Sequence, residues 1–123
     1  MTSEEFAAIR REVLHLHRML VEIERRDYER AHGRVSAGAL LHHLIHDASF
    51  AWLKPLTTLI AQMDELMDEP LDEAGMKASV DELRALLRPD AAGNDFQQRY
   101  GALLQQEPDL VVAHGSLARS ITK

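Results

Sequence analysis

The residues of this chain best suited to chemistry are its histidines. The chain has seven in 123 residues, and His42, His43 and His46 lie close together. Histidine is a common metal ligand and the side chain whose ordinary pKa lies nearest to physiological pH. On a helix, His42 and His46 would stand one turn apart on one face, where two imidazoles can chelate one divalent ion, as the histidines of HExxH do. The glutamate of that motif is absent, because His43 occupies its place. The pair therefore predicts either a metal-binding face or a helix face covered by another segment or a second subunit.

Two further histidines fall on predicted apolar helix faces. His17 lies on the same side of the first helix as Glu24 and Tyr28, and His114 lies in the apolar stripe of the last helix. Buried imidazoles and carboxylates must be paired, which favours structural hydrogen bonds at both positions. The alternative is a metal site between facing helices. The candidate ligands for such a site are His42, His43, His46, His17 and His114.

A binding pocket, if the chain forms one, is expected between the end of the first helix and the second. Tyr, His, Asp and Trp residues are densest there, and small pockets with aromatic and a few polar groups are the usual form of a ligand site. The candidate pocket residues are Tyr28, His42, His43, His46, Asp47 and Trp52. The sequence contains no glycine-rich phosphate loop, no nucleophile elbow and no dinucleotide-binding fingerprint, so we predict no catalytic residues.

Composition narrows the class of protein. The length predicts a single domain covering residues 1–123. The formal net charge is −6 and there are no cysteines, which argues against nucleic-acid binding, disulfides and cysteine-bound zinc. No apolar run approaches the length of a membrane span. The acidic, amphipathic N-terminus is unlike a signal peptide, so a cytoplasmic location is expected.

The hydrophobic pattern predicts an all-α protein, a bundle of five to six amphipathic helices. Thr2 begins a capping pattern before a long first helix. Pro55 interrupts the second helix and can itself sit in the first turn of a third, or the two form one kinked helix. A further break is expected at residues 69–71. The predicted ranges are 3–31, 37–53, 55–68, 73–88, 95–106 and 108–121. The first helix carries a coiled-coil-like apolar seam, formed by Phe6, Ile9, Val13, Leu16, Leu20 and Ile23.

The second helix has two unlike sides. A helical wheel places four large apolar side chains together, where they are expected to face the main core, with His42 and His46 largely opposite. The four are Leu40, Leu41, Leu44 and Ile45.

Residues 26–56 (RDYERAHGRVSAGALLHHLIHDASFAWLKPL) resemble a family of small uncharacterised bacterial helical proteins, a resemblance that supplies no activity. A shorter stretch, Leu41-His42-His43-Leu44 followed by Phe50 and Trp52, is similar to the DinB-like metal-binding four-helix bundles. That similarity implies His43 as a metal ligand. The family completes its site with an HxxxH pair late in the chain, where this sequence has His114.

These observations leave three hypotheses in order. The first is a non-enzymatic helical domain that acts through protein contacts, as a homodimer or with another protein; it needs no cofactor. The second is a helical bundle that binds a divalent transition metal through its histidines, either as a metal-binding protein or as a metal-dependent enzyme. The third is a contact that responds to pH through His42, His43 and His46.

Overall fold

The computed structural model describes residues 1–68 and 70–122. Its elements are α1 (Ser3–His32), α2 (Ala37–His46), the 3₁₀ helix η1 (Ala48–Leu53), α3 (Lys54–Asp68), α4 (Glu73–Leu86), α5 (Asp95–Leu104) and α6 (Pro108–Ile121). The described residues contain no strand, which confirms the all-α prediction. None of the described helices combines the length and apolar character that a membrane span requires. Glu69, at the predicted break, lies outside the described residues.

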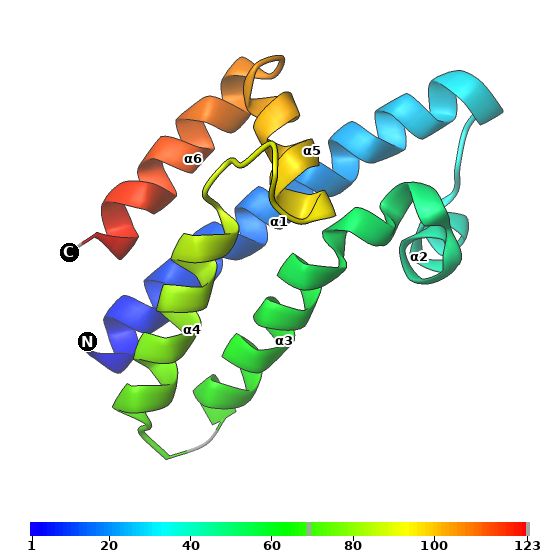
Figure 1. The fold of residues 1–123 in the computed structure, drawn as a ribbon. Helices are drawn as coiled ribbons and strands as arrows, with labels where there is room; N and C mark the ends of the chain where they lie inside the picture. The colour runs from blue at the N-terminus through cyan, green and yellow to red at the C-terminus, as the bar shows by residue number, and fades with distance from the viewer. Residues whose placement is uncertain (69, 123) are drawn as a thin grey trace.

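Four helices form a closed bundle. Each of α1, α3, α4 and α6 packs on two of the others, in the cyclic order α1–α3–α4–α6, and consecutive members run in opposite directions (Figure 1). The short helices α5 and η1 cover one end of this bundle, where η1 packs on α1, α3 and α5. The C-terminal part of α1 extends beyond the bundle, and α2 lies beside that extension (Figure 1). Therefore α2 sits at the edge of the molecule rather than in its core.

Local sequence signals set most helix ends. Thr2 Oγ1 accepts a hydrogen bond from the Glu5 amide at 3.0 Å, and Ser36 Oγ accepts one from the Ala39 amide at 3.2 Å. Asp72 caps α4 in the same way. Gly33 ends α1 with φ +84°, a conformation that glycine adopts without steric cost. Because these caps satisfy the free backbone donors of the first turn, the predicted helix starts agree with the structure to within one residue.

The apolar seam of α1 is used within the chain. Phe6, Val13, Leu16 and Leu20 are fully buried against the other bundle helices. A seam of this spacing can equally join two chains, and the sequence alone left that possibility open. Since the chain's own helices cover it here, any contact between copies has to use another surface.

The predicted second helix over 37–53 is wrong beyond residue 46. Asp47 has extended backbone angles (φ −88°, ψ 132°), and its Oδ1 accepts a hydrogen bond from the Ser49 amide at 2.8 Å. An aspartate side chain that bonds the backbone two residues on competes with helix formation. The chain then continues as η1, whose Phe50, Trp52 and Leu53 are buried. Pro55 sits in the first turn of α3, as predicted, where its missing donor costs nothing, and the second helix has already ended at residue 46.

Candidate functional site: an apolar groove beside an uncovered helix

Helix α2 is the most apolar of the helices but buries none of its residues. Leu41 is 60% exposed and Ile45 is 67% exposed. The residues that turn toward the rest of the molecule are Leu40, His43 and Leu44, each half-buried. The expectation that Leu41 and Ile45 face the main core is therefore wrong. The physical reason is that α2 packs chiefly on the short η1, which is too small to cover a wide apolar face.

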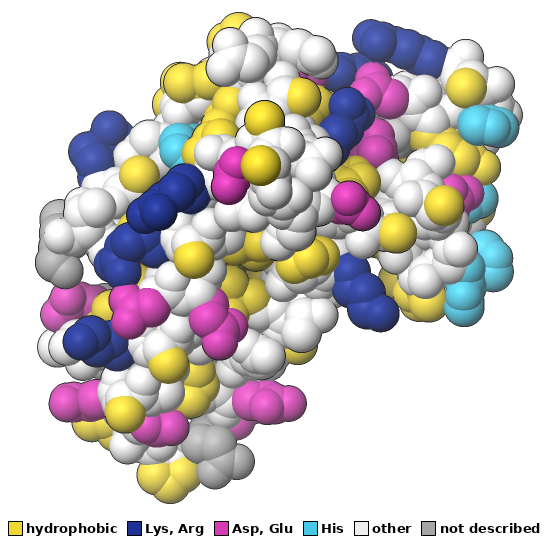
Figure 2. Space-filling view, in the orientation of Figure 1, with side chains coloured by type: hydrophobic (Ala, Val, Ile, Leu, Met, Phe, Trp, Pro, Cys, Tyr) yellow, Lys and Arg dark blue, Asp and Glu magenta, His cyan; other side chains and the backbone are white. Residues whose placement is uncertain are grey.

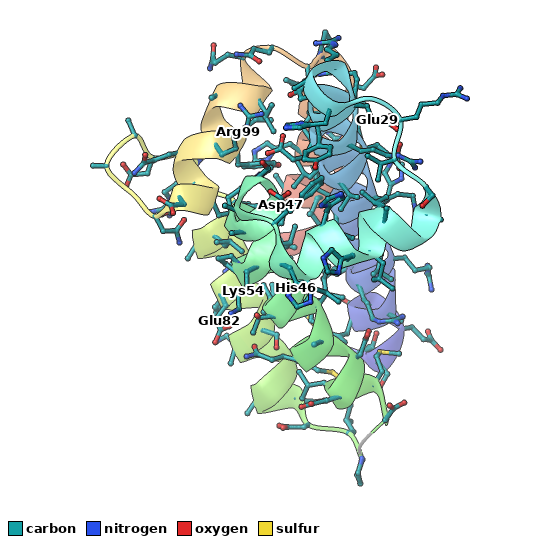
Figure 3. The ribbon with its side chains drawn as sticks, turned by 90° about the vertical axis from the view of Figure 1, so that its right-hand side faces the viewer. Glu29, His46, Asp47, Lys54, Glu82 and Arg99 are labelled. Atoms are coloured by element: carbon teal, nitrogen blue, oxygen red, sulfur yellow. The ribbon has the colours of Figure 1, made fainter. Side chains whose placement is uncertain are left out.

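A groove of about 590 Å³ runs along α2. One wall is Leu41, Leu44 and Ile45, and the other comes from α1, η1 and α3. The residues of that second side include His17, Phe50, Ala51, Leu53, Lys54 and Thr57. Figure 3 shows α2 lying crosswise in front of α1 and α3, with His46, Asp47 and Lys54 at the junction. The groove is therefore an apolar channel with a few polar groups at its edge.

Two of the polar side chains of the groove, His17 and Thr57, are engaged with each other. His17 Nε2 lies 3.1 Å from Thr57 Oγ1, and the Thr57 hydroxyl donates to the Leu53 carbonyl at 3.2 Å. Burial lowers the pKa of His17 below its ordinary value of 6.5. A neutral imidazole in this position adds no charge to the groove at neutral pH. His17 therefore joins α1 to α3 and does not meet Glu24 or Tyr28 in a shared network.

An aromatic cluster holds α2 against the end of α1. The ring of His43 lies 4.7 Å from that of Tyr28, which stacks on His32 at 4.2 Å. His43 also lies 6.3 Å from Phe50, and its Nδ1 is 3.3 Å from Asp47 Oδ2. The Ser49 amide, which donates to Asp47, is the main cause of a lowered pKa for that carboxyl. Tyr28, His43 and Asp47, three of the predicted pocket residues, are thus brought together, as supports for α2.

His42 and His46 form a separate pair on α2, and His46 also lines the groove. Their rings lie 4.7 Å apart and are tilted by 49°, and both residues are exposed. Neither forms a hydrogen bond with any other described residue. Histidine side chains gather at the edge of the molecule formed by α2 and the end of α1 (Figure 2). The three clustered histidines therefore separate into one structural ring, His43, and an exposed pair.

Trp52 lies on the other side of η1. Its Nε1 donates to Glu24 Oε1 at 2.8 Å, and Glu24, 9% exposed, also lies 3.4 Å from Arg99 Nη2. The Trp52 ring packs on Phe96 at 5.6 Å. Trp52 is thus separated from the groove and anchors η1 to α1 and α5.

His114 is also part of a structural contact. Its Nδ1 lies 2.7 Å from the hydroxyl of Tyr100, which is fully buried. Burial lowers the pKa of His114 and raises that of Tyr100. Across residues 1–68 and 70–122, no three His, Asp or Glu side chains converge in a group that could hold a metal ion. One chain by itself thus presents at most the His42–His46 pair.

Sequence reasoning missed the groove itself. Its wall residues Leu41 and Ile45 were assigned to the core, and Lys54 and Thr57 were not considered. A signal was present: residues 35–46 carry no Asp, Glu, Lys or Arg in a chain with 28% charged residues. A helix that is apolar or uncharged all round is normally buried. When the chain's own fold leaves the apolar side chains of such a helix exposed, they form a candidate surface for a binding partner.

Comparisons with protein-family models, with curated proteins and with solved structures give no match to this chain.

Proposed function

We propose that this protein is a non-enzymatic interaction domain that forms a symmetric homodimer through α2 and the adjoining groove. The observation that carries the proposal is the exposure of Leu41 and Ile45 on an uncharged helix that buries none of its residues. Contiguous apolar patches are rare on protein surfaces, and where they occur they usually mark interaction sites.

Burial of these side chains gives a driving force. Full burial of a leucine or isoleucine side chain contributes about 1.5–3 kcal/mol. Because 60% of Leu41 and 67% of Ile45 remain open to water, each has about 1–2 kcal/mol left to gain. A twofold axis repeats the gain on both chains, so four side chains contribute.

The shape of the surface suits a second copy. In a symmetric dimer the same patch lies on both sides, so one surface must offer both protruding groups and a recess. Here α2 offers Leu41 and Ile45 as protruding groups, and the groove of about 590 Å³ beside them is the recess. A ten-residue helix is only about 15 Å long. The groove is therefore needed to extend the contact toward the roughly 800 Å² per partner of a standard interface.

Charge also favours contact at this place. Each chain carries a formal net charge of −6, so two copies repel each other over most of their surfaces. The stretch from residue 35 to 46 has no charged side chain. Two copies that meet through α2 therefore bring no Asp or Glu of this stretch against each other.

The test is the oligomeric state of the double variant Leu41→Asp, Ile45→Asp. Light scattering across micromolar concentrations is expected to show a dimer for the unaltered protein and a monomer for the variant. The matched control is Val111→Asp, Val112→Asp on α6, whose side chains are 48% and 71% exposed outside the groove. The control should remain dimeric, and circular dichroism should show the same helix content in all three proteins.

Two results would overturn the proposal. One is an unaltered protein that stays monomeric at every concentration. The other is a dimer that persists in the α2 variant but is lost in the α6 control, which would place the contact on a different face.

A further inference from the structure

The exposed pair His42 and His46 lies next to the surface that we assign to the dimer. On a helix, each residue is rotated by about 100° from the one before it, so positions 42 and 46 form a strip beside positions 41 and 45. Two α2 helices that run antiparallel and pack across the Leu41–Ile45 strip would therefore bring their histidine strips to the same edge of the contact. On α2, the apolar strip of Leu41 and Ile45 therefore lies beside a strip of two potential metal ligands, His42 and His46.

One copy provides two ligands where a transition metal needs more. The two rings are 4.7 Å apart and lie one helical turn from each other. His43 does not add a third ligand, because its ring packs against Tyr28 at a tilt of 44° and its Nδ1 faces Asp47. Zinc is normally four-coordinate and tetrahedral in structural sites. A twofold axis converts two ligands into four without any further residue.

We propose that His42 and His46 of two copies bind one zinc-type transition-metal ion and thereby bridge the dimer. This inference rests on the proposed dimer and names a metal that would strengthen it. Imidazole nitrogen suits zinc, copper and nickel, whereas magnesium and calcium prefer oxygen ligands. No carboxylate lies between residues 35 and 46, so the ligand set favours the first group.

Helix α2 also leaves space for the second helix. Gly38 lies one turn before His42, and a Cβ atom added to it would meet nothing within 4 Å. The N-terminal end of the histidine strip is therefore bare backbone. Position 38 therefore presents no side chain that would keep a partner helix away from the histidine strip.

The experiment uses the full chain without a histidine tag, stripped with a chelator and then titrated with zinc in a calorimeter. We expect one zinc ion per two chains and at least a tenfold lower dissociation constant of the dimer. Magnesium should have no effect. In the double variant His42→Ala, His46→Ala, binding and tightening should both disappear. The control His15→Ala removes another exposed histidine of α1, outside the cluster that supports α2, and should behave like the unaltered protein.

The outcomes separate this inference from the proposed dimer. A dimer in chelator that zinc neither binds nor strengthens would refute the metal bridge and leave the proposed function intact. A monomer both with and without zinc would refute both. Zinc bound at one ion per chain, or bound equally by the His42→Ala, His46→Ala variant, would also refute the bridge. A dimer that forms only with zinc and is lost in that variant would support it.

Discussion

Removing the carboxylate of Glu24 should destabilise the fold that supports the groove. Glu24 is 9% exposed and accepts a hydrogen bond from Trp52 Nε1 at 2.8 Å. This bond joins α1 to η1, which forms part of the groove. The substitution Glu24→Ala leaves the indole N–H of Trp52 without its acceptor, while Trp52 itself stays buried at 8% exposure.

The magnitude follows from the local geometry. A buried donor without a partner costs about 1–3 kcal/mol, and the lost side-chain methylenes add about 1 kcal/mol. The ion pair with Arg99 adds little, because it is long, at 3.4 Å, and the Arg99 side chain is 35% exposed. We therefore expect Glu24→Ala to lower the free energy of unfolding by about 2–4 kcal/mol. Glu24→Gln keeps an acceptor oxygen and should lose about 1 kcal/mol.

Urea denaturation followed by circular dichroism measures this loss. The matched control is Glu22→Ala, on the same helix, whose side chain is 60% exposed and lies 3.7 Å from Arg25. That control should lose less than about 0.5 kcal/mol. In a Trp52→Phe background, Glu24→Ala should cost about 1 kcal/mol less than in the unaltered protein, because the donor has already gone. Equal losses for Glu24→Ala and Glu22→Ala would refute the reasoning.

Two further predictions concern a helix end and the buried histidines. Gly33→Ala should lower the free energy of unfolding by about 1 kcal/mol, because φ is +84° there. Gly115→Ala, inside α6, where an added Cβ meets Arg119 only at ordinary contact distance, should raise it by about 0.5 kcal/mol. Urea denaturation measures both changes, and a loss of stability at Gly115 as large as that at Gly33 would contradict this account. Burial lowers the pKa values of His17 and His114 below 6.5, so the unfolded chain takes up protons at these sites before the folded chain does. Their contribution to stability is present above pH 6.5 and is lost as pH falls toward their lowered pKa values. The variant His17→Gln, His114→Gln should therefore show a smaller drop in stability between pH 7 and acidic pH than the unaltered protein, as measured by urea denaturation, and an equal drop would contradict the assignment.

The helices and most of their ends follow from local sequence. Thr2, Ser36 and Asp72 cap helices through bonds to amides three residues away. Such bonds depend only on neighbouring residues, so they can be recognised without the fold. The buried seam of α1 is likewise visible as a spacing pattern, because burial on one helix face leaves a periodic trace. The all-α class and the α1 core residues could therefore be predicted.

The break at Asp47 and the exposure of α2 depended on tertiary structure. Residues 37–53 are good helix formers, and whether the chain continues as one helix depends on what lies beneath Phe50 and Trp52. Trp52 reaches Glu24 from η1, 28 residues away in the sequence, and a local pattern does not contain that contact. The predicted pocket residues lie in two separate places for the same reason. The sequence could place Tyr28, His43 and Asp47 near one another, but it could not place Trp52 on the opposite side of η1.

By itself, the sequence determined which residues form helices and which face of α1 is apolar, because these properties arise between neighbours one turn apart. It also determined that His42 and His46 share one face of a helix. Only the tertiary structure decided which apolar face has a neighbour to cover it. Periodicity distinguishes an apolar side from a polar one, but it does not say whether the covering helix belongs to the same chain. For Leu16 and Leu20 the covering helices belong to the chain itself, and for Leu41 and Ile45 they do not.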